Sequence, residues 1–316
     1  MDIRRRKWKY KKNPSFTQVH KGFSRVFRIP SSKSEENKYI ERVIEEDEYV
    51  DKNGRLKCIT IEYFGIEQNP FTLRVFLFLL AKLGVNKNNA SHIEKLNAID
   101  ESNKDIVRKL EYYVEPYEES ELTTLLKIET NYKELIEWFG MNYDNKAKNR
   151  LKRLLRKIQA SAIKIVIKDV KSNRERKVRS NLLLYQSENN SRKHHKISII
   201  FNPIAYLVLF ENHPLKTTVN LEIFRELAKR DVNKTILFYV LSDNLQFGET
   251  KKIHIEDLFP LWTKPAKSKQ TRHRRKRFIM ETLEEIEELS GGTFKFDIDE
   301  NDTIITAKRF LDRNST

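Results

Sequence analysis

Hydrophobic and polar positions follow one another in a recurring order along two stretches of the chain. In the first stretch, residues 122–128 predict a short strand, 131–139 a helix that Gly140 closes, and 147–163 a second helix after the polar turn at 141–145. The alternating residues 163–168, the basic turn 171–176 and the return strand 178–185 predict a hairpin. A strand, two helices and a hairpin in this order are typical of a winged helix.

The second stretch repeats this order nearer the carboxyl terminus. Its pattern predicts helices over 221–227 and 235–241, a strand over 252–254, a helix over 255–262, a long helix over 268–289, and a hairpin of 293–298 with 303–308 around the polar turn 299–302. Because two weak patterns agree, we expect an α+β fold of two tandem winged-helix domains, mainly helical with small antiparallel wing sheets.

Breaks in the pattern give the expected domain limits. An apolar helix over 71–83, between Pro70 and Gly84, belongs to the first domain, 58–211, and the break at Asn212, His213 and Pro214 precedes the second, 212–316. Residues 1–57 are charged, and we expect an N-terminal arm that is partly disordered. Its basic start, Arg4 to Lys7 with Trp8 and Tyr10, fits minor-groove or single-strand contact and a solubilising tail equally well.

The charge of the chain favours nucleic acid as its partner. The 61 basic and 45 acidic residues give a formal net charge of +16, so a polyanion attracts the whole molecule. No apolar run is long enough to span a membrane, and we expect no membrane partner. The single cysteine, Cys58, permits no disulfide within the chain, which fits a reducing cytoplasm.

Both predicted second helices have one apolar and one basic face, as recognition helices require. In the first, Leu151, Leu154, Leu155, Ile158 and Ala162 share a narrow arc, opposite Lys146, Asn149, Arg153, Arg156 and Lys157. Residues 146–179 hold fourteen basic and two acidic residues, which extends the basic surface onto the predicted hairpin.

The second long helix is polarised along its length. Basic residues fill its first half and five glutamates its second half, so only the amino-terminal half can approach phosphate. Gln270, His273, Arg274 and Arg277 lie opposite its apolar stripe and are the best candidates for reading bases. The full set predicted to contact DNA is Lys146, Asn149, Arg150, Arg153, Arg156, Lys157, Lys171, Arg174, Arg176, Lys177, Lys269, Gln270, Arg272, His273, Arg274, Arg275, Lys276, Arg277, Lys308 and Arg309.

Residues for catalysis are not arranged in a familiar pattern. The seven histidines lack metal-ligand spacing, and the adjacent His194 and His195 do not match the histidine pair of rolling-circle nickases. No phosphate-binding P-loop motif occurs among the eight glycines. We therefore expect no enzyme activity, no metal and no cofactor.

The carboxy-terminal third resembles the RepC replication initiators of IncQ-type plasmids. The resemblance rests on residues 233–238, 253–262, 271–277 running into 281–289, and the hairpin 293–308. It implies an initiator that binds directly repeated origin sequences, called iterons, helps open an AT-rich region, and admits a replicative helicase and primase. It assigns iteron contacts to Arg272, Arg274, Arg275, Lys276 and Arg277, whereas residues 1–57 do not match the family's pattern.

Three classes of DNA- or RNA-binding protein remain open from the sequence. An initiator predicts direct repeats with half-sites about one helical turn apart and roughly 20 protected base pairs. A tandem winged-helix transcriptional regulator predicts a palindrome read by a two-fold dimer. An RNA- or single-strand-binding module predicts stacking aromatics on the basic faces, and neither recognition helix carries them. The sequence leaves open whether the protein forms a homodimer.

Overall fold

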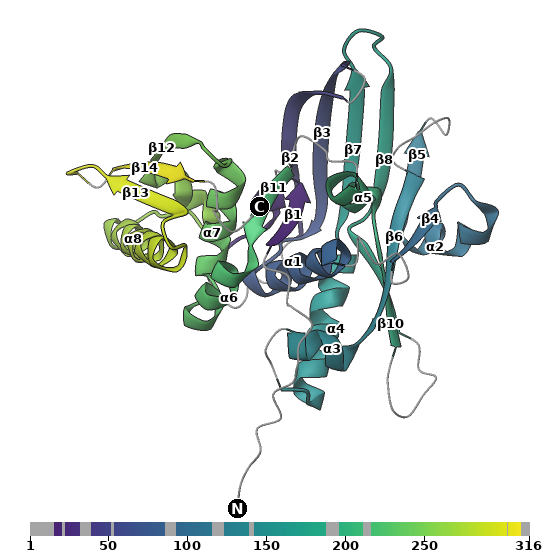
Figure 1. Ribbon diagram of the computed structural model, residues 1–316, viewed down its shortest axis with the longest axis horizontal. Helices are drawn as coiled ribbons and strands as arrows, with labels where there is room; N and C mark the ends of the chain where they lie inside the picture. The colour runs from purple at the N-terminus through teal and green to yellow at the C-terminus, as the bar shows by residue number, and fades with distance from the viewer. Residues whose placement is uncertain are drawn as a thin grey trace, which may run out of the picture.

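The protein has a mixed α/β architecture in which the named strands pair antiparallel in four sheets (Figure 1). The computed structural model describes residues 16–20, 23–31, 39–51, 54–85, 93–115, 123–138, 142–187, 196–210, 216–301 and 303–310. Within these residues, strands hold about as much of the chain as α-helices do. The expectation of a mainly helical protein with small sheets was therefore wrong in its proportions.

We call residues 39–210 the amino-terminal half and residues 216–310 the carboxy-terminal half. The amino-terminal half contains two sheets. The larger has the strand order β2-β3-β7-β8-β5, and the smaller has the order β4-β6-β10-β9. The bounds in the first are β2 (Tyr39–Val50), β3 (Leu56–Ile66), β7 (Ala162–Asp169), β8 (Glu175–Asn181) and β5 (Tyr113–Glu115). Those in the second are β4 (Ile93–Asn97), β6 (Thr124–Asn131), β10 (Lys196–Phe201) and β9 (Leu183–Ser187).

Helices of this half pack beside and below the sheets (Figure 1). They are α1 (Pro70–Val85), the 3₁₀ turn η5 (Glu101–Asn103), α2 (Lys104–Lys109), α3 (Tyr132–Trp138), α4 (Asn145–Gln159) and α5 (Pro203–Phe210). Caps fix where two of them start: the Asn69 side chain accepts the amide hydrogens of Phe71 and Thr72, and that of Asp144 accepts the amide hydrogen of Ala147. The predicted second helix ends at Gln159 rather than residue 163, because Ala162 already pairs in β7.

The carboxy-terminal half follows the predicted element order closely. Its elements are β11 (Lys216–Asn220), α6 (Leu221–Arg230), α7 (Lys234–Asn244), β12 (Thr250–His254), the 3₁₀ helix η7 (Ile255–Leu261), α8 (Lys269–Leu289), β13 (Phe294–Ile298) and β14 (Ile304–Arg309). The three-stranded sheet has the order β12-β14-β13. Pro260 lies inside η7, the short helix predicted over 255–262.

The amino-terminal segment joins the two halves. Strand β1 (Phe16–His20) pairs with β11, and the 3₁₀ turn η1 (Phe23–Val26) leads into Phe27. The Phe27 ring lies 6.0 Å from that of Tyr239 on α7, and the Phe23 ring 5.6 Å from that of Phe76 on α1. One buried hydrophobic cluster therefore runs through both halves.

The expected disorder of residues 1–57 is not what the structure shows where it describes them. Residues 16–20 and 39–50 form strands, and Phe23, Val26 and Phe27 are buried. The basic start over 1–15 lies outside the described residues. Charge made the segment look like an arm, but Val19, Phe23, Val26, Phe27 and Ile29 are buried in the shared core.

Candidate nucleic-acid interface

Helix α4 presents the predicted basic face to solvent. Leu151, Leu155 and Ile158 are buried, while Lys146, Asn149, Arg153 and Arg156 are exposed on the other side. Arg150 is also exposed, with its guanidinium 4.2 Å from the centre of the Phe71 ring, whereas Lys157 is half-buried. The amphipathic pattern therefore predicted correctly which side of α4 faces solvent.

A buried polar cluster fixes the end of α4 against the large sheet. The Tyr63 hydroxyl lies 2.7 Å from Oγ of Ser161, and Nε2 of Gln68 donates to the same oxygen at 2.8 Å. Burial raises the pKa of Tyr63 to about 12. Gly65 passes so close that a Cβ there would lie 2.7 Å from Cα of Ser161. The backbone of β3 can approach α4 only because this position has no side chain.

The first half of α8 is the second exposed cationic surface. Ser268 caps the helix by accepting the amide hydrogen of Thr271, and Lys269, Gln270, Arg272, His273, Arg274 and Arg277 are exposed. Carboxylates lie near two of them: Glu256 is 3.6 Å from Arg272, and Glu281 is 3.5 Å from Arg277. Lys276 is half-buried and donates to the carbonyl of Asn301 at 3.2 Å.

Arg275 was predicted to contact DNA, and the structure contradicts this. Its side chain is 4% exposed, donates to the backbone carbonyls of Phe259 and Lys264, and stacks 4.8 Å from the ring of Trp262. Burial lowers the pKa of this guanidinium. At 100° per residue, position 275 turns inward beside Ile279, so Arg275 tethers α8 to η7 instead.

Arg309 was also predicted to contact DNA, and it too is buried, at 3% exposure. Its guanidinium donates to the carbonyls of Ser242 at 3.0 Å, Leu245 at 2.9 Å and Thr218 at 2.7 Å. Burial lowers its pKa to about 10. It holds β14 to the end of α7 and to β11, and its neighbour Lys308 forms a 3.2 Å ion pair with Asp297.

The basic hairpin β7–β8 does not continue the surface of α4. Lys171 and Arg174 are exposed at its tip, Arg176 is half-buried, and Lys177 forms a 3.1 Å ion pair with Glu175. Two residues separate the end of α4 from the start of β7, which then runs along the large sheet. The tip of the β7–β8 hairpin therefore lies at the opposite end of this sheet from α4 (Figure 1). Pairing with β3 holds the hairpin in this sheet, which the local sequence could not show.

The hairpin that lies against α4 is β9–β10, whose strand β9 contacts the helix. Residues 188–195 between these two strands, including His194 and His195, lie outside the described residues. The predicted return strand 178–185 divides at Leu182: β8 pairs with β7, and β9 pairs with β10. The run Leu182 to Leu184 breaks the polar and apolar alternation, and this was the signal for the division.

The two halves share one arrangement of strands and helices. In the first, β6 precedes α3 and α4 and then pairs with β10, which pairs with β9. In the second, β12 precedes η7 and α8 and pairs with β14, which pairs with β13. In the second half, the cationic helix α8 directly precedes the hairpin β13–β14. In the first half, the strands β7 and β8 lie between the cationic helix α4 and the hairpin β9–β10.

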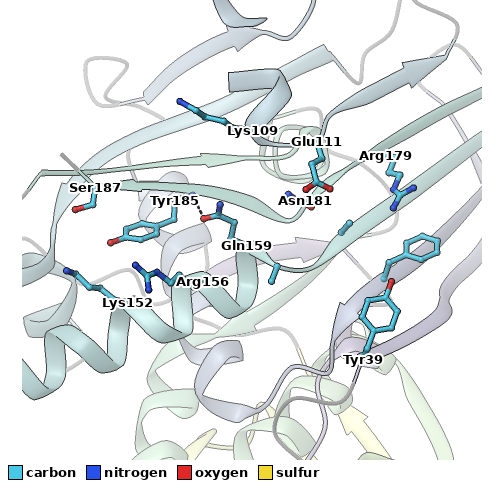
Figure 2. A pocket seen from close by; sticks show the side chains of 13 residues that line it. Tyr39, Lys109, Glu111, Lys152, Arg156, Gln159, Arg179, Asn181, Tyr185 and Ser187 are labelled. Atoms are coloured by element: carbon cyan, nitrogen blue, oxygen red, sulfur yellow. Dashed lines mark hydrogen bonds between the residues drawn. The ribbon is translucent and has the colours of Figure 1, made fainter. Parts of the chain in front are cut away.

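A recess opens where α4 meets the sheets, and most of its residues were not predicted as part of a site (Figure 2). It has a volume of about 730 Å³. Its labelled side chains come from α4 (Lys152, Arg156, Gln159), β9 (Tyr185, Ser187), β8 (Arg179, Asn181), β2 (Tyr39) and the end of α2 with the turn after it (Lys109, Glu111). Because these elements are far apart in sequence, no local pattern could have assembled them.

No other kind of site is evident in the described part of the chain. Its histidine, cysteine and acidic side chains form no group of three that could hold a metal ion. None of its helices is long and apolar enough to cross a membrane.

Comparison with known proteins yields no family. No protein-family model matches the chain, and no curated protein matches it. Two solved structures of domains 2 and 3 of RctB align over most of the chain at 10% sequence identity. One covers 92% of this chain and 96% of its own with a TM-score of 0.43, and the other 90% and 94% with a TM-score of 0.45. Likeness at this level does not define a function, which therefore rests on the residues of this chain.

Proposed function

We propose that this protein is a sequence-specific double-stranded DNA-binding protein that initiates plasmid replication at directly repeated origin sequences. In this proposal each half is a winged helix-turn-helix unit, and α4 and α8 are its two recognition helices. The protein performs no chemistry itself, and the helicase and primase that the RepC resemblance implies act after it has bound.

The observation that carries the proposal is the same strand order in both halves, each with an exposed cationic helix in the same place. A helix in that position of a winged unit is free to enter the major groove while its apolar side stays in the core. Arg and Asn are suited to bidentate contact with guanine and adenine edges, and Arg153, Asn149 and Arg274 are exposed on these helices.

The charge distribution along α8 supports an approach to DNA by its amino-terminal half. Glu285 and Glu288 in its second half pair with Lys234 and Arg230, so these acids serve the contact between α8 and the α6–α7 pair. The exposed cations are confined to the first half. The amino-terminal half of α8 therefore enters the groove, and the acidic half stays away from the phosphates.

Two different recognition helices on one chain favour an asymmetric site over a palindrome, because they read two different half-sites in a fixed order. Direct repetition of such a site is what the RepC resemblance implies. The resemblance of residues 233–308 to RepC initiators supports an origin as the place where such repeats lie.

Footprinting on the DNA that neighbours the gene tests the proposal. We expect clustered direct repeats, each protected over roughly 20 base pairs. Arg153→Ala should shorten protection at one half of each repeat and Arg274→Ala at the other half. Protection of an inverted repeat by a dimer would favour a transcriptional regulator, and the absence of any specific footprint would end both readings.

A further inference from the structure

The recess beside α4 differs in shape from the exposed helix faces proposed to bind duplex. It lies between the carboxyl-terminal half of α4 and strands of both sheets of the amino-terminal half (Figure 2). Its volume of about 730 Å³ falls within the usual range for a small-ligand site, roughly 300–1,000 Å³. A duplex presents its phosphates on a broad convex surface, whereas this recess suits a single small group.

Three of the cations that line the recess come from two elements. Lys152 and Arg156 come from α4, and Arg179 from β8 (Figure 2). Among the described residues, no carboxylate forms an ion pair with any of these three, whereas Lys109 pairs with Asp105 at 2.5 Å. Glu111 is the one carboxylate in the lining. Lys152 and Arg156 lie at one end of the recess, and cations without a carboxylate partner favour a phosphate there.

Aromatic rings and amides complete the lining. Tyr39 is 63% exposed and lies at one end of the recess. Phe64 also lines the recess, and the Arg179 guanidinium lies 5.5 Å from the centre of its ring. Tyr185 lies at the other end near Lys152 and Arg156, where Gln159 accepts the Tyr185 amide hydrogen at 3.1 Å. Exposed rings offer stacking surfaces to a base, and the amide of Asn181 can both donate to and accept from a base edge.

We infer that this recess binds one unpaired nucleotide, with its phosphate on Lys152 and Arg156 and its base against Tyr39. The central Asn181 and Glu111 then face the sugar and the edge of the base. This chemistry is shared by a free nucleotide and by one nucleotide of a single strand. Lys152 and Arg156 lie on α4, so the site shares this helix with the proposed duplex surface. Tyr39, Arg179, Asn181 and Glu111 lie on neither recognition helix, and variants of these residues can separate the two activities.

Fluorescence binding assays on the full chain at about 150 mM salt test the inference with four probes. The probes are etheno-ATP, a labelled ten-residue oligo(dT), pyrophosphate as a competitor that has no base, and a 20-base-pair duplex. Binding of etheno-ATP identifies a free nucleotide as the source, and binding of oligo(dT) alone identifies a single strand. Either result supports the site, and failure of both overturns it.

Variants separate the site from general electrostatic attraction. Arg179→Ala should weaken binding of the nucleotide probe about tenfold, whereas Arg108→Ala, an exposed control on α2 outside the recess, should not.

Tyr39→Ala should also weaken binding of the nucleotide probe about tenfold, and Tyr39→Phe should not, because stacking needs only the ring. Equal effects of Arg179→Ala and Arg108→Ala, or competition by pyrophosphate as strong as by the nucleotide, would overturn base recognition. Duplex binding should be unchanged in Arg179→Ala, so loss of one activity can be distinguished from loss of the other.

Discussion

Adjacent arginines on α8 have opposite environments. Arg274 is exposed, and Arg275 is buried against Trp262 and two backbone carbonyls. A basic run in a sequence does not distinguish them, because one residue turns a helix by about 100°. The resemblance to RepC proteins assigned both to DNA, and only one of them can reach it.

We expect Arg274→Ala and Arg275→Ala to fail in different assays. Arg274→Ala should cost about 1–3 kcal/mol on the specific site and less on random duplex, with unfolding unchanged. Arg275→Ala should lower the free energy of unfolding by on the order of 1–3 kcal/mol, because two partly buried hydrogen bonds to backbone carbonyls are lost along with the packing of the guanidinium on Trp262. Binding titrations and urea unfolding measure the two effects.

Lys229→Ala, an exposed cation on α6, is the charge-matched control and should change neither quantity by more than about 0.5 kcal/mol. Equal losses on specific and random duplex for Arg274→Ala would exclude base reading by that residue. Unaltered unfolding of Arg275→Ala would contradict its structural role.

Tyr63 makes stability depend on alkaline pH. Its pKa is raised to about 12 by burial, so the unfolded chain, with an ordinary pKa of about 10, loses the proton first. The stabilisation is complete below pH 10 and is lost as pH rises toward 12. We expect Tyr63→Phe to be less stable at neutral pH, since Ser161 and Gln68 lose a partner, but to lose less stability over that alkaline range. Parallel stability curves for the two proteins would disprove this.

At the scale of elements, the junction of β3 with α4 tolerates no side chain. Gly65→Ala would place a Cβ 2.7 Å from Cα of Ser161 at a φ of +144°, so a backbone has to move. We expect a loss of on the order of 2–4 kcal/mol in the free energy of unfolding. Gly54→Ala is the matched control: its φ is +74° but nothing lies within 4 Å, so it should cost only about 1 kcal/mol. Equal losses in the free energy of unfolding for the two variants would show that the positive φ alone, and not the close approach to Ser161, restricts position 65 to glycine.

Helix α4 and the tip of the β7–β8 hairpin should differ in how much they contribute to the salt dependence of DNA binding. Arg153 on α4 is proposed to meet a phosphate or base, whereas Lys171 lies at the distal tip of β7–β8. We expect Arg153→Ala to reduce the slope of log binding constant against log salt by about one unit, and Lys171→Ala to leave it unchanged. Binding measured between about 50 and 200 mM salt gives both slopes. A reduced slope for Lys171→Ala would show that the tip of the β7–β8 hairpin contacts DNA.

At the scale of the whole molecule, the amino-terminal segment holds the halves together. Phe27 is buried between α1 and α7, and β1 pairs with β11. We expect Phe27→Ala to lower the free energy of unfolding by about 3–5 kcal/mol while the protein still unfolds in a single transition, because one core spans both halves. Calorimetry measures this. Two separate transitions in the unaltered protein would show that the halves fold independently.

Local pattern was sufficient for much of the fold. The elements from α6 to β14 lie within a few residues of their predicted bounds, since the turns, caps and apolar spacing that specify them are close in sequence. The solvent faces of α4 and of the first half of α8 were also predicted, apart from Arg275. The pairing of β7 with β3, the division at Leu182 and the roles of Arg275 and Arg309 were not, because each depends on a partner far along the chain.

The sequence by itself determined a cationic chain with two amphipathic helices, since charge and helical spacing are properties of the residues and their order. Tertiary structure alone decided which cations stay in water, because burial depends on what packs above each side chain. It also brought Tyr39, Arg179 and Tyr185 to the carboxyl end of α4, where the helix has no exposed aromatic side chain of its own. Long-range strand pairing brought these rings to the same recess as Lys152 and Arg156, and no periodicity along the chain predicts that arrangement.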